Sequence, residues 1–208
     1  MPLRFYIREQ TDSGRVALFP GAYNPPTVAH VAIASAALAW ADEVVWVLPG
    51  AFPHKAFEHT GFEDRAAMLR KVVASDPQFS FASSGAGLYA DIGDEARAYY
   101  GGGPEIAILC GKDAAHRAAT WKYDSPGFYE AMSAKYRLLV AARRGEYLPE
   151  PAHRERVMPL EMPGNFDEVS SSEVRERLRI GGDWRSLVPP ELWDDVSRLY
   201  CQPPPSAR

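Results

Sequence analysis

The sequence predicts an α/β fold, a Rossmann-like doubly wound parallel sheet with a helical C-terminal end. Short β-branched and aliphatic runs alternate along the chain with longer helical patterns. A loop rich in proline and glycine links the first apolar run to an alanine-rich helix. The chain has 208 residues, 46% hydrophobic and 24% charged, as in an ordinary globular protein. We therefore expect one domain over residues 1–208, with a core at about 15–180 and a helical extension at about 181–200.

Strands are expected where short apolar runs lie between turn signals. The first run, RVALF, ends at Pro20-Gly21, and the second, EVVWVL, ends at Pro49-Gly50. No element is assigned to residues 1–10, which are polar and carry no signal-peptide core. The expected strands are 15–19, 43–48, 79–82, 105–109 and 136–142, with an extended piece around 157–160.

Helices are expected where apolar residues recur at helical spacing or where capping residues flank a run. Residues 62–75 carry an apolar stripe, and residues 171–180 begin with serine and end before Gly181-Gly182. A final helix opens at Pro189-Pro190 and ends at Tyr200. The expected helices are 27–40, 62–75, 91–100, one or two within 113–133 that break at Pro126-Gly127, 171–180, and this last one.

Composition narrows the functional classes. With 23 Lys and Arg against 27 Asp and Glu, the net charge is −4, which argues against nucleic acid as the main partner. The most apolar stretch, residues 28–41, contains His30 and is too short for a membrane span. Two cysteines, Cys110 and Cys201, cannot form a disulfide framework, so we expect a cytoplasmic protein. From the charge and the short apolar stretch, we expect that it binds neither nucleic acid nor membrane. Whether it forms a homo-oligomer is left open.

The first candidate motif follows the first strand, in residues 20–30. Ligands of open α/β sheets bind beyond the carboxyl ends of strands, and a helix N-terminus there favours an anion. Thr27 and His30 are three residues apart and share one face of the first helical turn. The alternative is a proline-rich turn with a capping threonine and a buried histidine.

The second candidate motif is the late segment Val169-Ser170-Ser171-Ser172-Glu173-Val174-Arg175. Hydroxyl groups, free backbone donors and a guanidinium converge at the start of one helix, which suits a polyphosphate. The alternative is an ordinary serine N-cap.

Together these motifs resemble the nucleotidylyltransferase superfamily of HxGH type, and more narrowly the nicotinamide/nicotinate mononucleotide adenylyltransferases. Residues 21–30 (GAYNPPTVAH) are similar to the family pattern G-x-F-[ND]-P-x-[HT]-x-x-H, and residues 169–175 to I-S-S-T-x-[IV]-R. The chain departs from H-x-G-H at Thr27 and Ala29. Further similar segments, covering about residues 15–180 in all, are Leu48-Pro49, Pro53-His54-Lys55, Arg65 with Met68-Leu69, Gly111-Lys112-Asp113, Trp121 and Arg143-Arg144-Gly145.

The resemblance implies transfer of AMP from ATP to nicotinamide or nicotinate mononucleotide, with Mg²⁺ accompanying ATP and no dedicated metal site on the protein. His30 would donate to the α-phosphate, and Thr27, Ser171, Ser172 and Arg175 would hold the β- and γ-phosphates. The implied catalytic residues are His30, Thr27 and Arg175. The implied ATP-binding residues are Gly21, Ala22, Tyr23, Asn24, Ser171, Ser172, Gly111, Asp113 and Arg143. Lys55 would meet the mononucleotide phosphate, Asp113 a ribose hydroxyl, and Trp121 the pyridine ring.

Other interpretations stay open or are set aside. The acceptor could instead be of phosphopantetheine or cytidylyl type, or the chain could bind nucleotides without turnover. The S-Y-T-x-x-T-L segment common in bacterial nicotinate enzymes is not evident in residues 83–95, so the preference between acid and amide is open. Residues 85–90 fit G-x-G-x-x-A but are interpreted as a loop, because the strand before them is short and is not the first. The chain has no Walker A motif, zinc-type spacing or G-x-S-x-G elbow.

Overall fold

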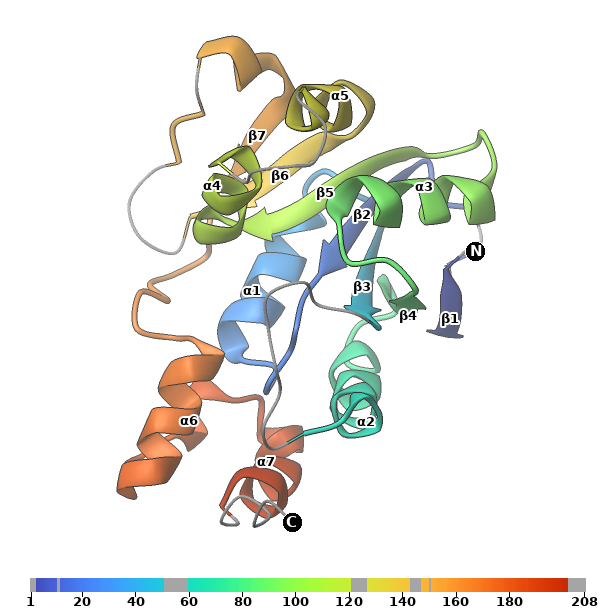
Figure 1. Cartoon of the computed structure of the whole chain (residues 1–208). Coiled ribbons are helices and arrows are strands. Elements are labelled where there is room, and N and C mark those ends of the chain that lie inside the picture. The colour runs from blue at the N-terminus through green and yellow to red at the C-terminus, as the bar shows by residue number, and fades with distance from the viewer. Residues whose placement is uncertain are drawn as a thin grey trace, which may run out of the picture.

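A largely parallel sheet forms the centre of the molecule (Figure 1). The computed structural model describes residues 3–10, 12–50, 60–120, 127–142, 147–149 and 151–201. Within these residues the sheet has seven strands in the order β1-β4-β3-β2-β5-β6-β7, all parallel except β1, which is antiparallel to β4. The strands are β1 (Arg4–Ile7), β2 (Arg15–Pro20), β3 (Glu43–Pro49), β4 (Phe79–Ser84), β5 (Glu105–Gly111), β6 (Arg137–Ala141) and β7 (Val157–Leu160).

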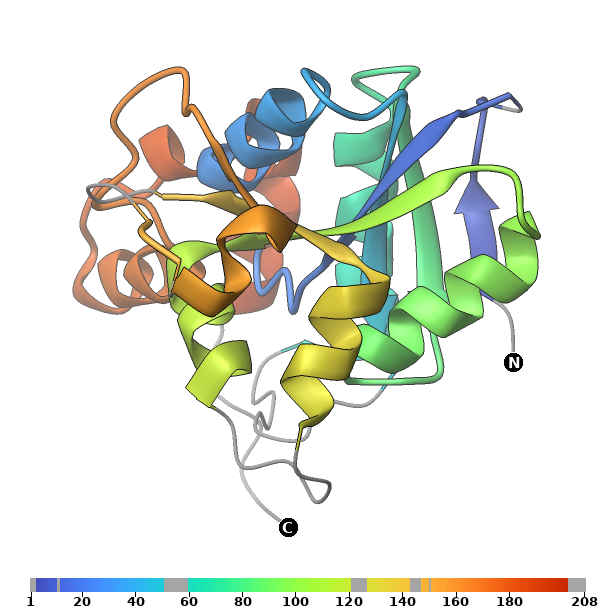
Figure 2. The ribbon, with the colours of Figure 1, turned by 90° about the horizontal axis from the view of Figure 1, so that it is seen from above.

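Helices cover both faces of the sheet (Figure 2), so the predicted doubly wound fold is confirmed. Alternation along β2 divides the core, because Ala17 and Phe19 pack with α1, α2 and α7, whereas Val16 and Leu18 pack with α3, α4 and α5. The helices are α1 (Val28–Ala37), α2 (Phe62–Val73), α3 (Tyr89–Tyr100), α4 (Lys112–Thr120), α5 (Phe128–Lys135), α6 (Ser171–Ile180) and α7 (Trp193–Tyr200), with short 3₁₀ turns η1 (Pro151–Arg156), η2 (Arg185–Leu187) and η3 (Pro190–Leu192).

The strand order reverses between β2 and β5. From β2 the chain crosses by α1 to β3 on one side, and β5 later pairs with the other side of β2. Leu18 is in register with both Val45 and Ile108, so the carboxyl ends of these three parallel strands meet at one edge. This reversal is the point at which doubly wound sheets bind ligands. It brings the loop after β2 next to the start of α4.

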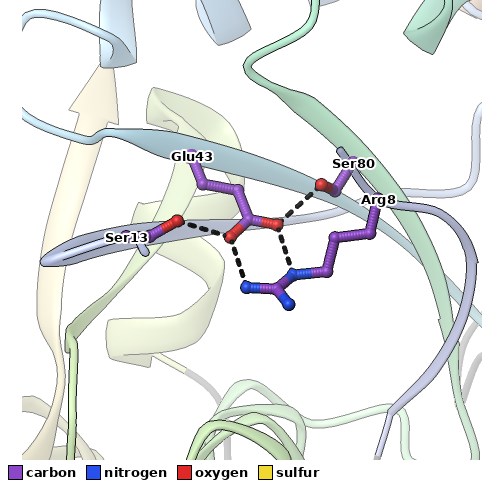
Figure 3. A network of polar contacts seen from close by, with 4 residues as sticks. All are labelled: Arg8, Ser13, Glu43 and Ser80. Carbon is purple, nitrogen blue, oxygen red and sulfur yellow. Dashed lines mark hydrogen bonds and ion pairs between the residues drawn. The ribbon is translucent and has the colours of Figure 1, made fainter. Parts of the chain in front are cut away.

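The edge strand β1 lies in the segment to which the sequence assigned no element. Tyr6 of β1 stacks on Phe81 of β4, with ring centroids 4.9 Å apart. After β1, the chain is fixed by the buried Glu43 carboxylate, which accepts hydrogen bonds from Arg8 at 3.1 and 3.4 Å, Ser13 at 2.8 Å and Ser80 at 2.6 Å (Figure 3). The interpretation of residues 1–10 as polar is therefore corrected, because Leu3 and Phe5 pack into one core cluster and Tyr6 and Ile7 into the other.

The C-terminal segment packs into the same core as α1 and α2. Its contribution consists of Trp184, Leu187, Val188, Leu192, Val196 and Tyr200. The helix expected after Pro189-Pro190 is split into η3 and α7, and Leu192 is both the last residue of η3 and the N-cap of α7. None of the helices in the described part of the chain has the length and apolar character that a membrane crossing requires.

Candidate active site

The loop after β2 turns sharply around Gly21 and Tyr23. Tyr23 has a positive φ of 49°, and a Cβ on Gly21 would lie 2.6 Å from the Tyr23 ring, so only glycine fits there. The Tyr23 hydroxyl donates to the Phe19 carbonyl, and burial raises the pKa of this phenol. Tyr23 is 1% exposed, so its ring lies in the core, and an ATP contact of this residue would have to come from its backbone.

Thr27 and His30 are linked by hydrogen bonds at the start of α1. The Thr27 backbone N–H donates to His30 Nδ1 at 3.1 Å, and Thr27 Oγ1 lies 2.7 Å from the same nitrogen. Because a backbone N–H can only donate, Nδ1 must be the acceptor, so the proton of the neutral imidazole is on Nε2. The local fold therefore prepares His30 as a donor through Nε2.

The role expected for Thr27 changes with this geometry. Its side chain is fully buried, so in this structure it cannot contact a phosphate as the sequence suggested. It orients His30 instead. His30 itself is only partly buried and packs against the Phe19 and Tyr23 rings, with centroids 6.1 and 5.3 Å away.

The late serine segment lies against the first loop, as the sequence predicts. Ser171 Oγ donates to the Pro25 carbonyl at 2.7 Å, and Arg175 donates to the Asn24 carbonyl. A second Arg175 nitrogen donates to Ser172 Oγ at 3.2 Å. The N-cap of α6 is the preceding Ser170, whose hydroxyl accepts from the Glu173 N–H at 3.0 Å. Ser171 and Ser172 are therefore not used for capping.

Three residues that the sequence did not assign to the site also hold this loop. Arg65 of α2 is 5% exposed and donates to the carbonyls of Ala22 and Gly61, each at 3.1 Å. Burial lowers the pKa of Arg65. Thr60 donates to Asn24 Oδ1 at 2.8 Å, and Tyr200 of α7 donates to the same oxygen. In the sequence, Arg65 stands out only as part of the R-x-x-M-L segment, and neither Thr60 nor Tyr200 belongs to a local motif.

The other wall of the site begins where β5 runs into α4. Gly111 is the last residue of β5, and Asp113 is exposed on the first turn of the helix. A cavity of about 640 Å³ opens here, and its volume is in the range of sites for small ligands. It is lined by Lys112, Asp113, His116, Arg117, Thr120, Tyr147 and Leu148.

Three predicted site residues, Lys55, Trp121 and Arg143, lie outside the described residues. Among the described residues, no group of three or more His, Cys, Asp or Glu side chains could hold a metal ion.

Residues 85–88 of the G-x-G-x-x-A segment form a loop between β4 and α3, as interpreted from the sequence, whereas Tyr89 and Ala90 already belong to the first turn of α3. Ser84 at the end of β4 donates to Glu95 at 2.7 Å and accepts from the Ala86 N–H at 3.0 Å. These internal contacts account for the conformation of the loop.

Comparison with known proteins identifies the family. The family model described as cytidylyltransferase-like matches residues 18–177. A probable nicotinate-nucleotide adenylyltransferase of Thermus thermophilus is 31% identical over 89% of this chain and 99% of its own length. One of Anaeromyxobacter dehalogenans is 30% identical over 89% of this chain and 96% of its own. The chain belongs to the cytidylyltransferase-like family and, within it, to the nicotinate-nucleotide adenylyltransferases, which are transferase enzymes.

Solved structures show the same fold. The nicotinic acid mononucleotide adenylyltransferase of Plasmodium falciparum, solved in complex with NaAD, matches with a TM-score of 0.69 and 16% identity over 88% of this chain and 95% of that chain. The same protein complexed with APC matches with a TM-score of 0.66. At this level of identity the likeness concerns the fold.

Proposed function

We propose that this enzyme transfers AMP from ATP to nicotinate mononucleotide in the cytoplasm, giving deamido-NAD and pyrophosphate, with nicotinamide mononucleotide as the alternative acceptor. The observation that carries the proposal is the joining of the two motifs at the β2/β5 reversal, with His30 oriented by Thr27 and Arg175 bound to the same loop. The names of the relatives at 30–31% identity favour nicotinate over nicotinamide.

The reaction is a direct displacement at the α-phosphorus of ATP. An oxygen of the mononucleotide 5′-phosphate attacks this phosphorus, the bond to the bridging oxygen of the β-phosphate breaks, and pyrophosphate leaves with that electron pair. No protein nucleophile is required, so the enzyme must align the two anions and stabilise the charge that develops. The Nε2–H of His30 is suited to donate to a non-bridging oxygen of the α-phosphate.

The β- and γ-phosphates are assigned to the start of α6. Arg175 and Ser172 carry polar hydrogens there, and the first backbone N–H groups of the helix add positive potential. The magnesium ion supplies charge neutralisation on the phosphate oxygens when it is bound with ATP. Arg175 contacts a neutral carbonyl and a hydroxyl, contacts that leave its positive charge available to the triphosphate.

The acceptor is assigned to the side of the site formed by α4. The carboxylate of Asp113 can accept from ribose hydroxyls, and the lysine and arginine that line the cavity beside it suit an anionic mononucleotide. Contacts of Lys55 with the mononucleotide phosphate and of Trp121 with the pyridine ring remain predictions from the family resemblance, as does a place near the nucleotide for Arg143.

Pyrophosphate release tests the proposal. The full chain is incubated with ATP, Mg²⁺ and, separately, nicotinate mononucleotide, nicotinamide mononucleotide, phosphopantetheine or a cytidylyl acceptor with CTP. We expect release with the pyridine mononucleotides and the largest kcat/KM with nicotinate. Faster turnover of a non-pyridine acceptor would replace the proposed substrate. ATP binding without release for any acceptor would favour a nucleotide-binding protein that lacks turnover.

A further inference from the structure

The C-terminal helix contacts the first loop of the candidate active site. Tyr200, the last residue of α7, donates its hydroxyl hydrogen to Asn24 Oδ1, across 176 positions of sequence. Figure 1 shows α2, α6 and α7 gathered at one end of the molecule, where the loop that follows β2 lies. Asn24 immediately precedes the segment that Ser171 contacts and is three residues before Thr27.

Asn24 is held at both its backbone and its side chain. Its carbonyl accepts from Arg175, while its side-chain oxygen accepts from Tyr200 and from Thr60, the latter at 2.8 Å. The residue is 9% exposed. A buried amide oxygen with two donors has a fixed orientation, and this fixes the plane of the loop between β2 and α1.

Tyr200 is suited to a permanent donor role. It is 9% exposed, and burial raises the pKa of its phenol, so it stays protonated at neutral pH. The hydroxyl contacts the same loop that Arg65 of α2 contacts at Ala22 and that Arg175 of α6 contacts at Asn24. The ring packs in the same core cluster as Val196 and Leu192.

Resting on the proposed function, we infer that Tyr200 is a positioning residue for ATP: its hydroxyl orients Asn24 so that the loop presents the triphosphate site together with α6. The C-terminal helix is thus part of the nucleotide-binding machinery, although it lies beyond the residues that the family model matches. In this role the hydroxyl of Tyr200, and not its ring, affects ATP binding, which distinguishes it from a residue that only fills the core.

Tyr200→Phe tests this, because it keeps the ring and removes one donor. The probe is an ATP analogue with a methylene bridge between its α- and β-phosphates, titrated by calorimetry into the full chain. We expect its Kd to rise about threefold to tenfold, the effect of one buried hydrogen bond, while the Kd of nicotinate mononucleotide stays unchanged. Tyr99→Phe is the control, since Tyr99 is 42% exposed and lies on α3, on the other face of the sheet.

A double variant shows whether the effect passes through Asn24. Thr60→Val removes the other donor to the same oxygen, so Tyr200→Phe in that background leaves a buried oxygen with neither donor. We expect the loss of analogue affinity in the double variant to exceed the product of the two single losses. A simple product of the single losses would mean that the two hydroxyls act separately and would overturn the inference.

A lowered melting temperature of Tyr200→Phe with an unchanged Kd for the analogue would also overturn it, because a purely structural role predicts that result. The readout does not depend on the acceptor. A wild type that binds the analogue but releases no pyrophosphate contradicts the proposed function alone, and a wild type that does not bind the analogue contradicts both.

Discussion

Two buried polar clusters lie at opposite ends of the neighbouring strands β2 and β3, and they use their hydrogen bonds differently. At the amino end of β3, the Glu43 carboxylate accepts from Arg8, Ser13 and Ser80, so acid and base neutralise each other inside the fold. At the carboxyl end of β2, the acceptors on Asn24 are neutral, and Arg175 binds one of them. The first cluster stabilises the fold, whereas the second leaves the positive charge of Arg175 without a negative partner among its described contacts.

Mutations in the two clusters should therefore have different effects. Changes in the Glu43 cluster should alter the free energy of unfolding and leave turnover of the folded enzyme intact. Changes around Asn24, Thr27 and His30 should lower ATP affinity or turnover of the folded enzyme. A buried charge that is already paired with an opposite charge cannot also neutralise a charged ligand. A charge whose partners are neutral can still do so.

The largest expected effect is on stability. Glu43→Ala leaves the Arg8 guanidinium and two hydroxyls without their acceptor, so we expect the free energy of unfolding to fall by about 3–5 kcal/mol, measured by urea titration. At temperatures where the variant is folded, kcat should match the wild type. Glu105→Ala is the control, because its pairs with Arg15 (3.9 Å) and Arg137 (3.6 Å) are half-exposed and should contribute less than about 1 kcal/mol. Equal losses in the two variants would contradict the distinction.

The largest expected effect on turnover is at His30. His30→Ala removes the donor to the α-phosphate, so kcat in the pyrophosphate assay should fall by roughly 10²–10³. The melting temperature should change little, since the side chain is only partly buried. His153→Ala, at the far end of the sheet in η1, should keep full activity. If His30→Ala unfolds while its folded fraction turns over normally, His30 belongs to the core alone.

Arg175→Lys keeps the charge and loses the planar fork that reaches both Asn24 and Ser172. We expect kcat/KM for ATP to fall roughly tenfold to a hundredfold, the effect of charge-assisted hydrogen bonds, with a much smaller change for the mononucleotide. Arg179→Lys on the same helix is the control, since Arg179 is exposed and pairs only with Glu176 in the contacts described here. An unchanged KM for ATP with an unchanged kcat would remove Arg175 from the triphosphate site.

Features with local causes were predictable from the sequence. The bounds of α6 follow from Ser170, which caps its N-terminus, and from Gly181, which takes the left-handed conformation at φ 71°. The position of the loop after β2 at the ligand-binding end of the sheet follows from the rule that ligand sites form where the strand order reverses. Both inferences need only short segments and the fold class.

Features held by distant partners were not predictable. The strand β1 depends on Tyr6 stacking against Phe81 and on Arg8 reaching Glu43. The run Phe5-Tyr6-Ile7 is typical of a strand, but nothing in it specifies these distant partners. The burial of Thr27 and the reach of Tyr200 to Asn24 likewise exist only after the helices have packed. A motif fixes which residue types are present, and tertiary packing determines which of them face the ligand.

The smallest expected effect concerns Thr27, and it tests the orienting role that replaced direct phosphate contact. Thr27→Val keeps the shape of the buried side chain and removes the hydroxyl 2.7 Å from His30 Nδ1. The backbone N–H still donates to that nitrogen, so the ring keeps one of its two contacts and its Nε2–H tautomer. We therefore expect kcat to fall only about threefold to tenfold, with KM for ATP nearly unchanged and activity restored in Thr27→Ser. Nitrogen-15 NMR of the imidazole gives an independent readout, because a proton found on Nδ1 of the wild type would contradict the orientation described here. A loss in Thr27→Val as large as in His30→Ala, together with a raised KM for ATP, would return Thr27 to the phosphate-binding residues.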